Sequence, residues 1–283
     1  MKKILFTMLF FLETCVFGYF DGALNWTTGK DGYVQQDVYL LFGKEGLWLK
    51  PSWLSWKSNS TDTFNSFAVR VGFEKPSYTL AFTGGFIPEK SGYKNVSIGG
   101  DITFSLNPTS SSRKRLAGPN SGFISRSASG VTQLDFGASA ALIAHNYIAL
   151  GADLNEINTS LFAGAKVFLT QISINYSLST YDKESLAKTQ ITPTQRISGI
   201  NSVFPVFIKS SFNARVEIPQ SPLVTPYLSY NRIKTKRDES VDVYALGAYI
   251  DLAMVGVTIQ LETYKDINSK TQRYLSLGAG VRF

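Results

Sequence analysis

Apolar and polar residues alternate with a period of two along most of the chain. In the last ten residues, YLSLGAGVRF (274–283), every second position is apolar or small up to the final phenylalanine. The stretches VFPVFIKSSFNARVEI (203–218) and QISINYSLS (171–179) alternate in the same way. Successive side chains of a β-strand point to opposite faces of the sheet, so each stretch predicts a strand with one apolar and one polar face.

The same pattern predicts about fourteen strands, separated by clusters of turn-forming residues. They are expected at residues 34–43, 47–57, 63–73, 77–87, 94–106, 131–143, 146–155, 159–169, 170–181, 203–218, 223–233, 241–252, 254–265 and 271–283. The segment 47–57, LWLKPSWLSWK, carries tryptophan and leucine on both parities, so its faces cannot be assigned. It also contains Pro51, which cannot donate to a strand ladder. A barrel of twelve strands therefore remains the alternative.

The apolar faces of so many strands exceed what one protein interior could bury. Charged residues make up 17% of the chain, against about 25% in typical soluble domains. A lipid bilayer accepts apolar side chains on the outside of a protein, but every backbone group in lipid must be hydrogen-bonded, which requires the sheet to close. Tilted strands of about ten residues are long enough to span it. The predicted fold class is all-β: a transmembrane antiparallel up-and-down β-barrel.

The beginning of the chain has the layout of a secretory signal peptide. Two lysines follow Met1, an apolar run occupies residues 4–12, and Val16 and Gly18 precede the expected cleavage site. Cys15 raises a second interpretation, a lipoprotein signal, although the residues before it are not small. Whether this cysteine is lipidated stays open.

Three segments are expected from this. Residues 1–18 form the signal peptide, residues 19–33 a short periplasmic segment, and residues 34–283 the barrel. Cleavage after residue 18 leaves a mature chain without cysteine, which excludes disulfides and thiolate metal sites.

The strand count also predicts which connections share one end of the barrel. Bacterial barrels place both termini on the periplasmic side, with short turns there and longer loops outside. Counting strands back from the C-terminus places both long connections, 107–130 and 182–202, at the outer end.

The C-terminal strand resembles the targeting strand of bacterial outer-membrane proteins. Its residues of one parity, expected to act as an assembly signal, are Leu275, Leu277, Ala279, Val281 and Phe283. In that class the barrel assembly machinery recognises such a strand. In size and expected strand number the chain is similar to small monomeric porins. The resemblance implies a location in the outer membrane of a Gram-negative bacterium, with outer-membrane lipid and the assembly machinery as partners.

The inward parity combines small polar residues with a nearly balanced set of charges. The pore-lining candidates are Arg70, Asp101, Asp135, Asp153, Lys166, Lys209, Arg215, Glu217, Asp251, Glu262 and Arg282. Large inward aromatics are few, and a barrel of this width is too wide for small side chains to fill. We therefore expect a water-filled lumen and a porin, a passive diffusion channel for small polar solutes or ions. The alternative for each charge is that it pairs and serves the fold alone.

The formal net charge of +7 comes mainly from the connections between strands. The longest expected outer loop carries a basic patch, Arg113, Lys114, Arg115 and Arg126. On an exported barrel such a patch suits contact with lipopolysaccharide or attraction of anionic solutes, and not nucleic acid.

Enzymatic activity is not indicated. His145 is the only histidine and is expected in a short periplasmic connection, and no GxSxG, HExxH or P-loop pattern occurs. The sequence therefore predicts no catalytic, cofactor or metal site. Two other functions remain open. One is a transporter of hydrophobic compounds, similar to the fatty-acid channel class, with Tyr19, Phe20 and Trp26 as a small plug. The other is a structural or adhesive barrel.

Overall fold

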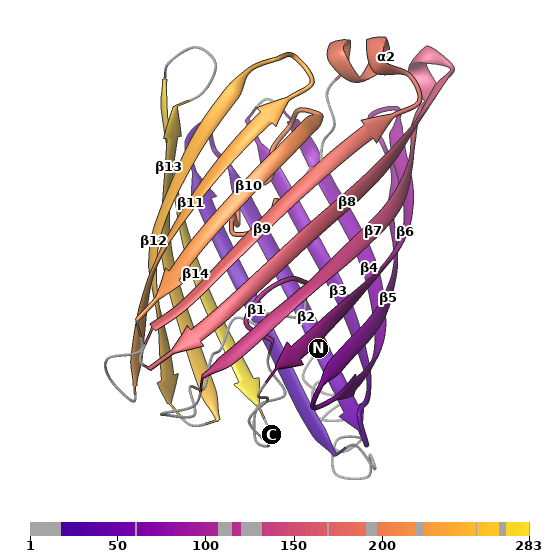
Figure 1. Ribbon diagram of the computed structural model, residues 1–283. Helices are drawn as coiled ribbons and strands as arrows, with labels where there is room; N and C mark the ends of the chain where they lie inside the picture. Colours follow the sequence, from indigo (N-terminus) through magenta and orange to yellow (C-terminus); the bar gives the residue numbers. More distant parts are fainter. Residues whose placement is uncertain are drawn as a thin grey trace, which may run out of the picture.

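The computed structural model describes residues 18–59, 61–106, 115–119, 132–168, 170–190, 197–218, 223–252, 254–265 and 270–282. Within these residues, fourteen antiparallel strands close into one barrel (Figure 1). Each strand pairs with its neighbours in sequence, and the first strand pairs with the last over nine residue pairs, from Asp21 opposite Arg282 to Gly29 opposite Tyr274. The predicted fold class and the larger of the two predicted strand numbers are confirmed.

The strands are long, and two short helical segments lie between them. The strands are β1 (Tyr19–Gly29), β2 (Val34–Lys44), β3 (Leu47–Ser58), β4 (Thr61–Lys75), β5 (Tyr78–Lys90), β6 (Tyr93–Leu106), β7 (Gln133–Tyr147), β8 (Ala152–Val167), β9 (Thr170–Tyr181), β10 (Ile208–Glu217), β11 (Val224–Thr235), β12 (Ser240–Leu252), β13 (Val255–Lys265) and β14 (Thr271–Arg282). A 3₁₀ turn, η1 (Ile148–Leu150), follows β7, and α2 (Glu184–Thr189) follows β9. Among the described residues, no helix is long and apolar enough to cross a membrane.

The predicted number of strands is right only because two errors compensate each other: one strand was missed, and another was counted as two. Tyr19–Gly29, expected to lie outside the barrel, is β1 and pairs with both β14 and β2. The segments 146–155 and 159–169, expected as two strands, form one strand, β8, and β7 continues to Tyr147. Trp26, expected in a plug, is half exposed on the outer face of β1.

The merged strand reverses the position of the longest connection. β1 begins and β14 ends at one end of the barrel, called here the terminal end, and α2 lies at the other, called the distal end (Figure 1). β6 ends and β7 begins at the terminal end, where Ser105 N–H donates to the carbonyl of Ser77 in the turn between β4 and β5. The connection 107–132 therefore starts and finishes at the terminal end, and not beside the connection 182–207 as expected.

Tight turns hold neighbouring strands in register. Glu45 and Gly46 join β2 to β3 with φ of 54° and 90°, and Ser91 and Gly92 join β5 to β6 with φ of 52° and 74°. Two consecutive positive φ angles are the signature of the two-residue turn whose twist matches that of paired strands.

The outer face of the barrel is apolar, as the alternation predicts. Large apolar side chains in mid-strand are widely exposed there, including Phe82 (63%), Ile98 (64%), Leu161 (67%) and Leu246 (61%). Water would oppose this much exposed apolar surface, whereas lipid accepts it. Because the sheet is closed, no strand edge is left unpaired in the bilayer. The barrel is therefore built to span a membrane.

Candidate functional site in the barrel lumen

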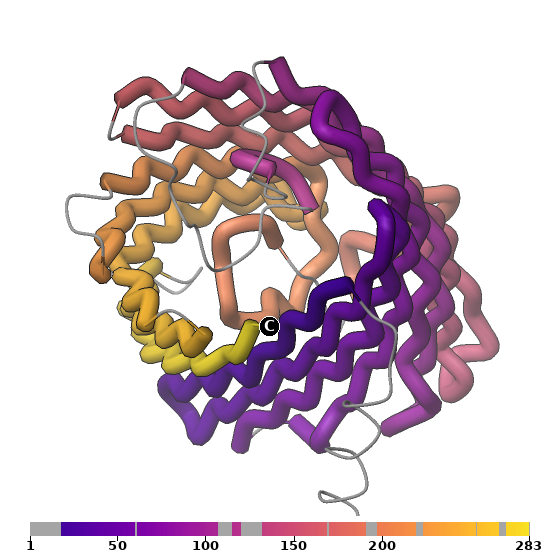
Figure 2. The backbone as a smooth tube through the Cα atoms, turned by 90° about the horizontal axis from the view of Figure 1, so that it is seen from below, coloured from indigo at the N-terminus to yellow at the C-terminus, as the bar shows by residue number. Residues whose placement is uncertain are grey.

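Two chain segments enter the lumen from opposite ends. Residues 197–207, between α2 and β10, form the distal insert, and residues 115–119, between β6 and β7, form the terminal insert. Figure 2 looks along the barrel and shows the distal insert as an orange loop inside the ring of strands, with the short magenta terminal insert beside the wall. These inserts divide the lumen into regions with different chemistry.

Hydrogen bonds fix the distal insert to inward-facing side chains. The Glu262 carboxylate accepts from the backbone N–H of Asn201 (2.5 Å) and from the backbone N–H and Oγ of Ser202 (3.4 and 2.8 Å). Gln35 Nε2 donates to the carbonyl of Asn201 (2.7 Å), and Val203 N–H donates to the hydroxyl of Tyr33 (2.9 Å). Glu262 is fully buried, so its role is to hold the insert.

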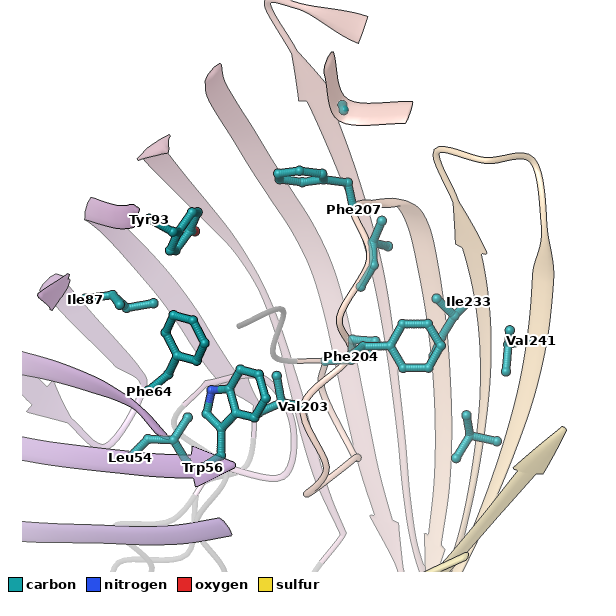
Figure 3. Close-up of a cluster of buried hydrophobic side chains, with 14 of the residues drawn as sticks. Leu54, Trp56, Phe64, Ile87, Tyr93, Val203, Phe204, Phe207, Ile233 and Val241 are labelled. Carbon is teal, nitrogen blue, oxygen red and sulfur yellow. The ribbon is translucent and has the colours of Figure 1, made fainter. Parts of the chain in front are cut away.

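Apolar packing completes the attachment of the insert at the distal end. Val203, Phe204 and Phe207 of the insert lie among inward side chains of many strands, including Trp56 and Ile233 (Figure 3). The Phe207 side chain is 1% exposed, and its ring lies 5.3 Å from that of Tyr181, edge to face. The expectation that large inward aromatics are few is wrong at this end. Several inward aromatic side chains of the strands pack against the apolar residues of the insert. Packed side chains of the insert and of the strands therefore narrow the distal part of the lumen.

His145 belongs to this distal region. It was expected in a periplasmic connection, but it lies on the inward face of β7 and is 2% exposed. Its Nδ1 is 2.7 Å from the Tyr93 hydroxyl, and its Nε2 is 3.1 Å from the Glu156 carboxylate, which also accepts from Ser179 Oγ. The imidazole packs edge to face with Phe207 at 5.1 Å. This cluster supports the insert from the opposite wall.

The terminal insert is held by Arg115. This residue was expected in an exposed basic patch, but it is 1% exposed. Its guanidinium donates to Thr79 Oγ1 (2.7 Å), to Ser105 Oγ and to the carbonyls of residues 75 and 76 (2.6 and 2.9 Å). The Asp135 carboxylate, fully buried, accepts from the backbone N–H of Leu116 (2.6 Å). Arg115 and Asp135 thus anchor a segment of the longest connection inside the barrel.

Most predicted pore-lining charges do face the lumen, and several are paired. Arg70 bonds to Asp101, and Arg215 Nε lies 2.9 Å from Glu217. The Arg215 guanidinium also lies over the Tyr227 ring at 3.7 Å.

The remaining inward charges lie near the barrel ends or under an insert. Arg282 lies 3.9 Å from Asp21 at the terminal end, and Asp251 is on the inward parity of β12 at the same end. Lys166 is buried on the inward face of β8. Glu262 and Asp135, described above, hold the two inserts.

Two predicted pore-lining residues face outward. Asp153 falls on the exposed parity of β8, where Asn146 donates to it, because β8 is one strand and not two. Glu156, which sits three residues later on the inward parity, was overlooked because it lay in the expected turn. Lys209 is 54% exposed and 3.8 Å from Asp238. A register shift between Ile208 and Ser210 interrupts the alternation, so Lys209 does not share the inward face of the later odd-numbered residues of β10.

Other predicted residues lie outside the described part of the chain. They are residues 1–17, Arg113, Lys114, Arg126 and Phe283. The described residues of the expected assembly signal, Leu275, Leu277, Ala279 and Val281, lie on the exposed parity of β14. Their role in assembly remains a prediction.

A polar chamber of about 590 Å³ lies between the inserts. Its floor and roof include Leu116, Gly118 and Pro119 of the terminal insert and residues 197–201 of the distal insert. Its charged lining residues are Asp37, Lys50, Arg70, Arg215 and Glu217, whereas the lining residues from β7, β8 and β9 are serine, asparagine and glutamine. The chamber is a compartment for polar molecules inside a barrel with an apolar exterior.

No protein-family model and no curated protein matches the chain. Among solved structures, Pseudomonas aeruginosa OprD is similar with a TM-score of 0.45 and 9% identity, covering 94% of this chain and 95% of that one. The KdgM porin is similar with a TM-score of 0.44 and 6% identity, covering 93% and 99%. A bacterial polysaccharide outer membrane secretin is similar with a TM-score of 0.46 and 8% identity, covering 95% and 100%. Similarities this low do not assign a function, which follows instead from the lumen.

Proposed function

We propose that this chain is an outer-membrane porin, a passive diffusion channel for small polar solutes or ions. The observation that carries the proposal is the polar chamber of about 590 Å³ enclosed by a barrel with an apolar exterior. A purely structural barrel has no need to keep polar side chains around an unfilled space, because packed apolar side chains would stabilise it better. The inserts narrow the path on both sides of the chamber, which favours small solutes.

Two other functions were left open by the sequence: a transporter of hydrophobic compounds and a structural or adhesive barrel. The lining of the chamber argues against the first, and a conductance measurement is needed to test the second. A transporter of hydrophobic compounds requires an apolar path, and the described lining is mostly serine, asparagine, glutamine and charged residues. The apolar side chains at the distal end pack against the insert, so they form a buried cluster and not the lining of an apolar path. A structural or adhesive barrel would not conduct, so conductance separates it from a porin.

The proposed location is the outer membrane of a Gram-negative bacterium, reached by export with residues 1–18 as signal peptide. The terminal end then faces the periplasm, as in other bacterial barrels. The connection carrying Arg113, Lys114 and Arg126 begins and ends on that side, so the contact with lipopolysaccharide expected for this patch is withdrawn. Outward lysines at the distal end, such as Lys57 and Lys94, suit the phosphates of lipopolysaccharide better. The assembly machinery would recognise β14.

The test is single-channel recording of refolded residues 19–283 in a planar bilayer, alone and with residues 108–129 deleted. Folding of both forms is checked by the heat-sensitive electrophoretic mobility of the barrel. We expect steady ohmic openings and a larger conductance after the deletion, which removes the terminal insert. Absence of conductance from both folded forms would refute the channel.

A further inference from the structure

We propose that the chamber selects neutral solutes that carry several hydroxyl groups, such as a sugar alcohol or a small sugar. This inference rests on the proposed channel function and adds the class of solute. The groups that select it lie on one wall of the chamber, formed by the inward faces of β8, β9 and β10. We call the uncharged polar residues of this wall the hydroxyl–amide ladder. Its members that line the chamber are Asn158, Ser160, Gln171, Ser173, Asn175, Ser177 and Ser211, and Ser179 and Asn213 continue the same strand faces.

The ladder is uncharged along the whole inward face of β9. Its five residues from Gln171 to Ser179 at alternate positions are serine, asparagine or glutamine. Alternate residues of a strand stand about 6.7 Å apart, so a solute that moves along the wall meets a new polar group at each short step. Hydroxyl and amide side chains both donate and accept hydrogen bonds. They therefore match the hydroxyls of a solute, which also do both.

Cross-strand pairing widens the ladder beyond one strand. Ser177 lies opposite Ser160 of β8 and Ser211 of β10, and the Oγ atoms of Ser160 and Ser177 are 2.9 Å apart. Asn158 Nδ2 donates to Ser179 Oγ at 2.8 Å on the adjacent row. Three neighbouring strands thus present hydroxyls and amides as one surface, which a solute with several hydroxyls can contact at several points at once.

The charges around the chamber favour neither sign of ion. The lining holds three cations and two anions, and Asp101, bonded to Arg70, balances them. An ion that entered would lose hydration without meeting a net opposite charge, which is costly. A neutral solute exchanges its bound water for the ladder at much lower cost.

A second observation at the chamber points to a hydroxyl-bearing solute. Glu217 is 6% exposed and lines the chamber beside Gln171, its cross-strand partner. Its Oε1 is paired with Arg215, whereas its Oε2 is buried and accepts no hydrogen bond from the described residues. A buried carboxylate oxygen of this kind is costly to leave unpaired. The hydroxyl of a bound solute can donate to it.

The inserts contact the ladder at two places. Leu116 of the terminal insert lies next to Gly164 on β8, and its carbonyl accepts from Gln171 Nε2 at the foot of the ladder. Gly199 of the distal insert lies beside Asn213 at the upper part of the ladder. The part of the chamber between the two inserts is therefore bounded on one side by β8, β9 and β10.

The experiment uses three six-carbon solutes of similar size that carry several hydroxyls and differ in charge: sorbitol, gluconate and glucosamine. Tracer uptake of each is measured in proteoliposomes of residues 19–283 in symmetrical KCl, so that osmotic and charge gradients are absent. We expect sorbitol to enter faster than gluconate and faster than glucosamine. Equal rates for the three, or a faster rate for either ion, would overturn the inference and leave the channel standing. Lack of uptake of all three, together with lack of KCl conductance, would instead overturn the channel itself.

The ladder is tested with a double variant, Ser173→Ala with Ser177→Ala, which removes two hydroxyls and little volume. The loss of one net hydrogen bond to the solute predicts sorbitol uptake that is slower by about two- to tenfold, a larger fall than that of KCl conductance. Ser52→Ala is the matched control, because Ser52 lines the opposite wall on β3. A loss of sorbitol uptake that is equal in the control and in the double variant would contradict the ladder.

Discussion

Replacing Glu262 with leucine should release the distal insert. Glu262 is fully buried on β13, and its carboxylate accepts from Asn201 N–H (2.5 Å), Ser202 Oγ (2.8 Å) and Ser202 N–H (3.4 Å). Leucine has a similar volume and no acceptor, so these donors would stay buried without partners. Glu262→Gln keeps one carbonyl oxygen and should have a smaller effect.

The size of the effect follows from the two shorter contacts. A buried donor that loses its partner costs about 1–3 kcal/mol, so two such donors shift the equilibrium by about 2–6 kcal/mol toward the released insert. Since about 1.4 kcal/mol corresponds to a factor of ten, the ratio of released to docked insert rises by a factor of about 30 to 20,000. The apolar contacts of Phe204 and Phe207 remain, so we expect intermittent release and not permanent loss of the insert.

The assay is single-channel recording of the folded Glu262→Leu variant. Release of the insert widens the distal end, so we expect additional openings of higher conductance that the parent lacks, and fewer of them in Glu262→Gln. Glu89→Leu serves as control, because Glu89 is exposed near the distal end of β5. The reasoning is refuted if folded Glu262→Leu shows the conductance and open probability of the parent.

Four further changes test other parts of the structure. Phe207→Ala should lower barrel stability by about 3–5 kcal/mol, measured as an earlier heat-induced shift in electrophoretic mobility. Arg115→Ala leaves two hydroxyls and two carbonyls without their donor, so the terminal insert should detach and single-channel conductance should rise. Leu161→Arg places a charge on the lipid face and should cost about 2–4 kcal/mol, measured by urea titration of refolding into lipid. Hydrogen bonds from Asn155, the backbone N–H first, lower the pKa of the exposed Asp182 carboxyl. Their contribution is present above the ordinary aspartate pKa and lost as pH falls through the lowered value. The protection of the Asn155 amide against hydrogen exchange, relative to its intrinsic rate at each pH, should therefore fall there, and Asp182→Asn should remove that dependence.

The barrel was predictable because lipid imposes a strict rule on the outer face. Every mid-strand position that faces lipid must be apolar, so the period of two survives even where the inward face varies. This is why β9 and β14 fall where the alternation places them. The rule does not determine what the inward face contacts, and the errors of prediction lie there.

The inward face at the distal end could not be predicted from local pattern. Trp56 and Leu54 face the lumen, which made the segment 47–57 apolar on both parities and its faces unassignable. They are inward because the distal insert, far away in sequence, packs against them. The buried position of His145 has the same cause, since it contacts Phe207 of the insert.

The topology error arose from polar residues in mid-strand. Asn155, Glu156 and Asn158 resemble a turn in sequence, so β8 was divided and the connection 107–132 was assigned to the wrong end. In the structure Glu156 and Asn158 face the lumen and bond to β7 and β9. A signal was present nonetheless, because Leu154, Glu156, Asn158 and Ser160 keep one parity without a break.

The most direct test of the account asks which parity faces water. Residues 19–283 contain no cysteine, so single cysteines can be placed at Ser177 on the ladder and at Leu161 on the exterior. Each is treated with a charged, membrane-impermeant thiol reagent during single-channel recording. The account predicts that Ser177→Cys reacts and that its current falls, whereas Leu161→Cys is protected by lipid and its current is unchanged. Reaction at Leu161→Cys with protection at Ser177→Cys would contradict the polar chamber and the channel built on it.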